Sequence, residues 1–233
     1  GFMMLPMVAG MMTATIISGQ ITSKTGKYKI FMVIGPTLLS LGYFYLTSFN
    51  ADTQYWQASI GMILIGLGLG QLMQTLTLAA QNSVPASEVG VATASATFFR
   101  QMGGTLGVAV FISILFNNLK DTIPAAFKNP QIQAGIKAAM TDPKVMGDPN
   151  NAQFLHANPA ELAGKLSTDS SFLNKLDPRL ARPFLVGFAD AGVTVFTIAG
   201  VVVAVAIVIA IFTKAPALRT KSAVQEAAAA AAH

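Results

Sequence analysis

Apolar residues form five long, nearly uninterrupted runs along the chain. The runs cover residues 2–19, 30–48, 58–80, 91–116 and 185–213. Each is close to the roughly 20 residues that an α-helix needs to cross about 30 Å of hydrocarbon. Lipid offers no partners for backbone N–H and C=O groups, so a spanning segment must be a helix or part of a closed barrel. The runs lack the alternation of barrel strands. The pattern therefore predicts an all-α integral membrane protein with about five transmembrane helices, four of them within residues 1–116.

The longest polar stretch lies between the fourth and fifth apolar runs, at residues 117–184. It carries both charge signs and several prolines. Ile132–Met140 and Pro159–Leu166 could each form an amphipathic helical turn or two. Large apolar residues are few, so we expect no separate hydrophobic core there. The stretch is expected to be a solvated loop, with a small lid or hairpin as the alternative.

Basic residues in the short polar stretches predict the orientation. The loop at 20–29 carries three lysines and no acid, and the tail at 214–233 is also mainly basic, whereas the loop near residue 50 holds only Asp52. By the positive-inside rule the first loop and the tail are cytoplasmic. Five crossings then place the 117–184 loop on the extracytoplasmic side. The expected location is the cell membrane, with the lipid bilayer as a partner.

The composition narrows the function classes. Charged residues make up 11% of the chain, against about 25% in soluble domains. The net charge of +5 does not indicate nucleic-acid binding, because the basic residues flank apolar runs and form no stripe with aromatics. Cysteine is absent, and His156 and His233 are the only histidines, so we expect no metal site and no cofactor. No enzyme motif is present, and we expect no catalytic residues.

Arg100 is the most informative polar residue within an apolar run. Placing Arg inside a membrane span costs about 2.5 kcal/mol or more, so it usually faces a cavity or an acidic partner. The alternative is that Arg100 reaches the lipid headgroups. No carboxylate occurs inside the first four apolar runs. An acidic partner of Arg100 is therefore expected outside this chain.

Other polar and small residues indicate a path and close helix packing. Gln71, Gln74 and Thr75 share one helix face, which could line an aqueous path or bond to another helix. Phe99 could stack on an aromatic cation, although ordinary packing is the alternative. Two pairs of glycines spaced by four residues are expected to let helix backbones approach closely: Gly66 with Gly70, and Gly103 with Gly107.

Asp190 stands near the start of the last apolar run. It is a candidate proton-coupling acid. The alternative is that it marks the start of the span, where a carboxylate suits the positive end of the helix dipole.

Two stretches resemble the major facilitator superfamily. The first loop resembles its G-x-L-x-D-R-x-G-R-R motif at Gly19, Lys24, Gly26 and Lys27, with Ser23 in place of the usual Asp. The stretch from Gly66 to Gly107, which contains FFRQMGGTLG, is similar to the fourteen-helix drug:proton antiporter branch. The resemblance covers residues 1–116 well, the last apolar run loosely and the long polar stretch not at all.

The resemblance implies that the chain is the C-terminal part of an exporter, with its last five helices. The missing N-terminal helices, protons and small amphipathic, cationic substrates would be its partners. The first loop would belong to a cytoplasmic gate, Arg100 would orient a gating or coupling network, and Gln71 and Gln74 would line the path. Other interpretations are a membrane scaffold that binds a partner, or an inactive truncated remnant.

Overall fold

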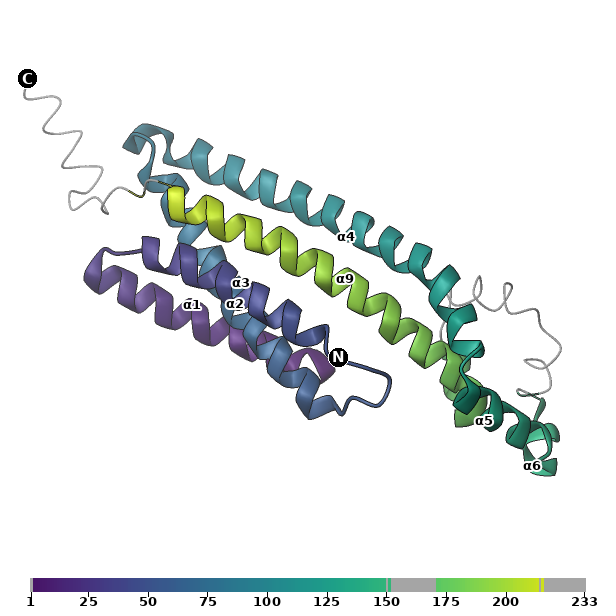
Figure 1. Cartoon of the computed structure of the whole chain (residues 1–233). Coiled ribbons are helices and arrows are strands. Elements are labelled where there is room, and N and C mark those ends of the chain that lie inside the picture. Colours follow the sequence, from purple (N-terminus) through teal and green to yellow (C-terminus); the bar gives the residue numbers. More distant parts are fainter. Residues whose placement is uncertain (1, 150, 152–170, 214, 216–233) are drawn as a thin grey trace, which may run out of the picture. The chain divides into compact units, whose positions relative to one another are not determined.

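A computed structural model of the chain describes residues 2–149, 151, 171–213 and 215 (Figure 1). All regular secondary structure in these residues is helical. Five of the helices are long and apolar enough to cross a membrane. The predicted all-α membrane fold is therefore confirmed. The expected helical turn at Pro159–Leu166 lies outside the described residues, as does the expected tail at 214–233 apart from Ala215.

The five spanning helices range from 18 to 39 residues in length. They are α1 (Leu5–Thr25), α2 (Lys29–Leu46), α3 (Tyr55–Asn82), α4 (Val89–Phe127) and α9 (Pro178–Phe212). The shorter elements are the 3₁₀ turns Phe2–Met4, Ala86–Glu88 and Ser171–Lys175, and the helices α5 (Pro130–Met140) and α6 (Pro143–Met146). The expected helical stretch Ile132–Met140 thus lies within α5.

Helices α4 and α9 are longer than their apolar runs. α4 has 39 residues and α9 has 35, which correspond to about 58 and 52 Å of helix. A bilayer core of about 30 Å uses only part of each. The structure therefore differs from the expected loop at 117–184, because helix continues to Phe127 and begins again at Pro178. Hydropathy marks where the apolar run ends and not where the helix ends.

The chain divides into two compact units. Unit 1 contains residues 1–46, 54–108 and 197–233, and unit 2 contains residues 47–53 and 109–196. Both α4 and α9 contribute residues to each unit (Figure 1).

In unit 1, α1 packs along α3 through glycines. A Cβ atom added to Gly66 would overlap the carbonyl oxygen of Met7, and one added to Gly70 would overlap that of Met11. In the other direction, a Cβ on Gly10 would lie 2.8 Å from the carbonyl oxygen of Ile63. Residue numbers rise together along the contact, so the two helices are parallel. Only glycine allows these backbones to approach so closely.

Helix α2 packs against α3 in the opposite direction. A Cβ on Gly35 would lie 3.1 Å from the Gly68 carbonyl oxygen, and one on Gly42 would lie 3.3 Å from that of Gly61. Residue numbers fall on α3 as they rise on α2, so the pair is antiparallel. Ser40 also donates a buried hydrogen bond of 3.1 Å to the Gly200 carbonyl of α9. Alternating directions are what successive membrane crossings require.

Unit 2 has a hydrophobic core of its own. Its buried residues come from α4, α5, α6, the bend just before α9 and α9 itself: Leu119, Ile123, Ala139, Val145, Leu176, Leu180, Ala181, Phe184 and Ala191. Phe127 and Phe184 add an edge-to-face ring contact at 5.5 Å. The expectation that this stretch lacks a core is wrong. The extended ends of α4 and α9 supply the large apolar residues that the intervening stretch does not have.

Side-chain caps start both short helices of unit 2. The Asn129 side chain accepts a 3.0 Å hydrogen bond from the Gln131 N–H at the start of α5. The Asp142 side chain accepts a 3.1 Å bond from the Lys144 N–H at the start of α6. A proline follows each cap, at the first helical position, where its missing N–H costs nothing.

Candidate functional site

The predicted path residues of α3 are largely buried. Thr75 is fully buried, and its hydroxyl donates a 2.8 Å hydrogen bond to the Gln71 carbonyl. Gln71 is 9% exposed, and its side-chain oxygen is buried without a hydrogen-bond partner among the described residues. Gln74 is half-buried, and its amide nitrogen lies 3.9 Å from where a Cβ on Gly19 would stand. A buried amide oxygen that accepts no hydrogen bond destabilises the fold. A hydrogen-bond donor from outside the described residues would therefore stabilise this position.

Helix α1 also carries a row of hydroxyl groups along its buried side. Its buried residues recur every fourth position and include Ser18 and Thr22. The Thr15 hydroxyl lies 2.8 Å from the Met11 carbonyl and 3.2 Å from the Gly70 carbonyl of α3. The Thr22 side-chain oxygen is buried without a partner in the described part of the chain. Sequence reasoning missed this row, although its four-residue spacing was the available signal.

The loop between α1 and α2 depends on Gly26 and Tyr28. Gly26 has a φ of +70° and donates a 2.8 Å hydrogen bond to the Thr22 carbonyl, which closes the end of α1. A left-handed conformation of this kind favours glycine. Tyr28 is buried, and its hydroxyl lies 3.5 Å from the Asn82 amide nitrogen at the end of α3. Lys24 and Lys27 are exposed. The loop is therefore anchored while its charges remain free to contact a partner or lipid headgroups.

Arg100 and Phe99 do not join the α3 residues through any hydrogen bond or ring contact in the described structure. The Arg100 guanidinium lies 3.4 Å from the Thr97 hydroxyl on its own helix. Phe99 is 72% exposed and makes an edge contact with Phe98 at 5.6 Å. The candidate path residues thus fall into two groups: Gln71, Gln74 and Thr75 on α3, which are buried or half-buried, and Phe99 and Arg100 on α4, which are exposed and half-buried.

The two glycine pairs also differ between α3 and α4, because only the α3 pair contacts another helix in the described structure. Gly66 and Gly70 receive α1, as described above. No atom lies within 4 Å of where a Cβ would stand on Gly103 or Gly107. The α4 pair is therefore open to another element.

Asp190 is exposed and lies about three turns inside α9, which begins at Pro178. Because the helix begins well before Asp190, this carboxylate does not lie at the positive end of the helix dipole, whereas its place at the start of the membrane span stays a prediction.

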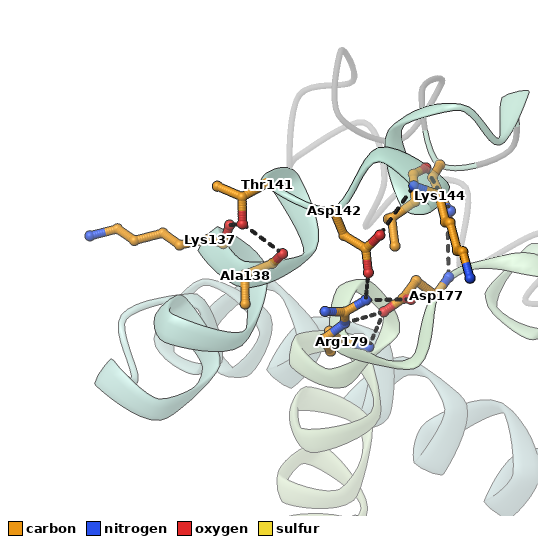
Figure 2. A network of polar contacts seen from close by, with 9 residues as sticks. Lys137, Ala138, Thr141, Asp142, Lys144, Asp177 and Arg179 are labelled. Carbon is orange, nitrogen blue, oxygen red and sulfur yellow. Dashed lines mark hydrogen bonds and ion pairs between the residues drawn. The ribbon is translucent and has the colours of Figure 1, made fainter.

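Unit 2 carries ion pairs that sequence reasoning missed. Arg179 contacts Asp142 at 3.1 Å and Asp177 at 2.9 Å, and so joins the start of α9 to the start of α6 (Figure 2). Arg182 bonds both carboxylate oxygens of Asp52 at 2.5 Å. The arginine in each pair holds the pKa of Asp177 and of Asp52 below the ordinary value of 3.8. Asp142 and Asp52 are far in sequence from their arginines, so no local pattern could reveal these two pairs.

The described residues contain no group of three or more His, Cys, Asp or Glu side chains that could hold a metal ion. Their polar side chains are amides, hydroxyls, lysines, arginines and carboxylates, several of which form ion pairs. Such groups bind and orient molecules by hydrogen bonds and charge.

Comparison with known proteins identifies a family whose model matches part of the chain. The Major Facilitator Superfamily model matches residues 1–108. A tetracycline resistance determinant of Streptomyces rimosus is 29% identical over 87% of this chain and 57% of its own length. The multidrug transporter protein MdtP of Bacillus subtilis is 38% identical over 49% of this chain and 21% of its own length. No solved structure matches the chain.

The match lies over the helices that carry the resemblance. Residues 1–108 contain α1, α2, α3 and the first part of α4. An uncharacterised MFS-type transporter of Mycobacterium tuberculosis is 34% identical over 54% of this chain, yet only 18% of its own length is covered. The chain thus spans between about a fifth and somewhat more than half of these relatives. Over residues 1–108 the chain is therefore similar to proteins of the major facilitator superfamily.

Proposed function

We propose that the chain is the C-terminal part of a secondary active transporter that exports small amphipathic, cationic molecules in exchange for protons. The observation that carries the proposal is the superfamily match over residues 1–108. Relatives over this region include proteins named for tetracycline resistance and for multidrug transport. The export would proceed by alternating access, with the substrate bound near the bilayer midplane.

The buried amides of α3 supply the substrate-facing chemistry in this proposal. The Gln71 side-chain oxygen lacks a donor in the described structure and accepts hydrogen bonds only. An ammonium or amide N–H of a substrate supplies such a donor. Because Gln71 is buried, the path must open before the substrate reaches it, as alternating access requires. Gln74 and Thr75 extend the same face, and Phe99 would contact aromatic substrates.

The loop between α1 and α2 acts as part of a cytoplasmic gate. Gly19 stands beside Gln74, and Gly26 shapes the end of α1. Lys24 and Lys27 are exposed and bind acidic groups of the opposing half in one state of the cycle. Lysine excess in this loop supports its cytoplasmic location in the cell membrane. Unit 2 then lies on the extracytoplasmic side.

Asp190 is the chain's candidate for proton coupling. It is an exposed carboxylate within the long helix α9. Other coupling acids are expected in the helices that precede this chain. The proposal predicts that neutralising Asp190 weakens the dependence of export on the proton gradient.

A membrane scaffold that binds a partner through unit 2 is the second candidate. It is favoured by the hydrophobic core of unit 2, which makes that region a folded surface instead of a linker. The scaffold interpretation predicts normal membrane insertion and no transport.

Dye efflux in cells tests the proposal. The complete transporter is expressed in pump-deficient cells loaded with ethidium, with its surface level measured. We expect ethidium efflux that a protonophore abolishes, and loss of most efflux in Gln71→Leu at an unchanged surface level. A well-expressed transporter without efflux of ethidium or any other cationic dye would contradict the proposed substrate class and favour the scaffold.

A further inference from the structure

Helix α4 has two unlike arcs between Thr97 and Val110. At about 100° per residue, one arc carries five polar or small residues and a single bulky apolar one, Val108: Thr97, Arg100, Gln101, Gly104, Thr105 and Val108. The other carries bulky apolar residues: Phe98, Phe99, Met102, Leu106 and Val110. We call the first set the polar arc. A surface that faces lipid requires bulky apolar side chains. The second arc provides them, and the polar arc does not.

Part of the polar arc is exposed in the described structure. Gln101, Gly104, Thr105 and Val108 line a shallow groove and are all exposed, whereas Thr97 and Arg100 are half-buried. Apart from the backbone of α4 itself, no described atom lies within 4 Å of where a Cβ on Gly104 would stand. Polar side chains exposed to hydrocarbon are costly, so this groove needs a partner in the membrane.

Arg100 indicates the chemistry of that partner. Its recorded contact is the Thr97 hydroxyl at 3.4 Å, and it belongs to none of the ion pairs found in the described residues. Helices α1, α2 and α3 contain no carboxylate. Glu88, just before α4, is about 18 Å away along the axis, well beyond ion-pair distance. A cation at this depth is normally paired, and the missing group is an anion.

We propose that the polar arc is the contact surface for another membrane-spanning helix of the same transporter, and that this helix places a carboxylate against Arg100. The inference rests on the proposed function only in taking the chain as part of a longer transporter. The matched relatives support that condition, because the chain covers 57% of one and 21% of another.

The chain itself shows how such a contact is built. On α3, Gly66 and Gly70 are spaced by four residues and receive the backbone carbonyls of α1. On α4 a single glycine, Gly104, lies near the centre of the polar arc, with open space among the described residues where a Cβ would stand. In a second copy of this chain, α1 to α3 have no carboxylate, so the partner of Arg100 would have to be Asp121 of α4 or Asp190 of α9, and crosslinking tests that case.

A double-mutant cycle on the complete transporter tests the proposal without any transport measurement. Arg100→Gln is combined with neutralisation of each membrane-embedded Asp or Glu outside residues 1–233, and thermal stability is followed by fluorescence-detected size exclusion. We expect Arg100→Gln to lower Tm by about 5 °C or more. One neutralised carboxylate should lower Tm similarly, and its double variant should be no less stable than either single variant.

Three comparisons decide the outcome. Arg100→Lys should retain more stability than Arg100→Gln, and Leu106→Met on the bulky arc should leave Tm nearly unchanged. An unchanged Tm in Arg100→Gln, or strictly additive losses with every carboxylate, would overturn the proposal and leave Arg100 to lipid phosphate. Oxidative crosslinking of a Gly104→Cys transporter into a dimer, in a cysteine-free background, would assign the face to a second copy instead. Because all readouts are structural, a failure of drug export would not affect them.

Discussion

Gly66 of α3 lies so close to Met7 of α1 that a Cβ atom on the glycine would overlap the Met7 carbonyl oxygen. The two helices are parallel here and meet backbone to backbone. The contact therefore depends on the absence of a side chain at Gly66. It also sets how closely α1 and α3 approach each other beside their buried polar residues.

The first prediction compares glycines on two helices. Gly66→Ala should destabilise the protein, because either α1 must move or the overlap must be relieved. We expect a loss of about 2 kcal/mol or more, as in other overpacked contacts. Gly103→Ala should be neutral or slightly stabilising, because its site is open and alanine favours helix. Thermal unfolding in detergent measures both. Equal effects of the two substitutions would show that the α1–α3 contact is less close than described.

The second prediction separates stability from transport at Gln71. Gln71→Leu removes a buried oxygen that has no donor in the described structure, so stability should be unchanged or should rise by about 1 kcal/mol. Transport should nevertheless fall at least tenfold if the amide receives the substrate. Thr77→Val, on an exposed hydroxyl of the same helix, serves as the control. Parallel losses of stability and transport in Gln71→Leu would indicate a structural role for the amide.

The third prediction concerns acid. Arg182 lowers the folded-state pKa of Asp52 below 3.8, so the pair contributes stability above that value, and the contribution is lost as pH falls through the lowered pKa. Stability from this pair should be constant from pH 7 to about 5 and decline below about pH 4. Asp52→Asn should reduce the acid-dependent part of unfolding. Melting curves from pH 7 to 3, at low and high salt, provide the measurement. An identical acid dependence in the variant would mean that the pair does not form.

The fourth prediction concerns the ion pairs in Figure 2. Arg179 joins Asp142 and Asp177, so Arg179→Ala should loosen the start of α6 from α9. Because Arg179 is more than a third exposed, solvent screens the ion pairs and we expect only a small loss of stability. Hydrogen exchange at residues 143–147 should accelerate, while exchange in α3 should not change. Lys137→Ala, at an exposed lysine of α5, is the matched control. Unchanged hydrogen exchange in Arg179→Ala would show that the arginine does not help to hold unit 2 together.

Sequence predicted the membrane helices well because hydropathy reports burial in lipid directly. It placed the end of the fourth helix at 116 and the start of the last at 185, whereas the helices extend to Phe127 and from Pro178. Past the apolar run, these ends are stabilised by packing around Ile123 and Phe184, which hydropathy does not report.

The candidate site could be predicted only in part for a related reason. Gln71 and Thr75 stand out because polar residues are rare in an apolar run. The buried position of Tyr28 and the pairing of Asp52 with Arg182 depend on contacts between distant segments. No spacing along the chain encodes such contacts. Whether Gln71 and Arg100 act in transport is likewise a property of the whole transporter.

Reconstitution tests the central claim most directly. The complete transporter is placed in liposomes with an imposed proton gradient, and accumulation of a fluorescent cationic drug is followed. The account predicts accumulation that depends on the gradient, collapses on addition of a protonophore and falls at least tenfold in Gln71→Leu. Accumulation that is equal with and without the gradient, or is unaffected by Gln71→Leu, would contradict a proton-driven exporter whose path includes α3.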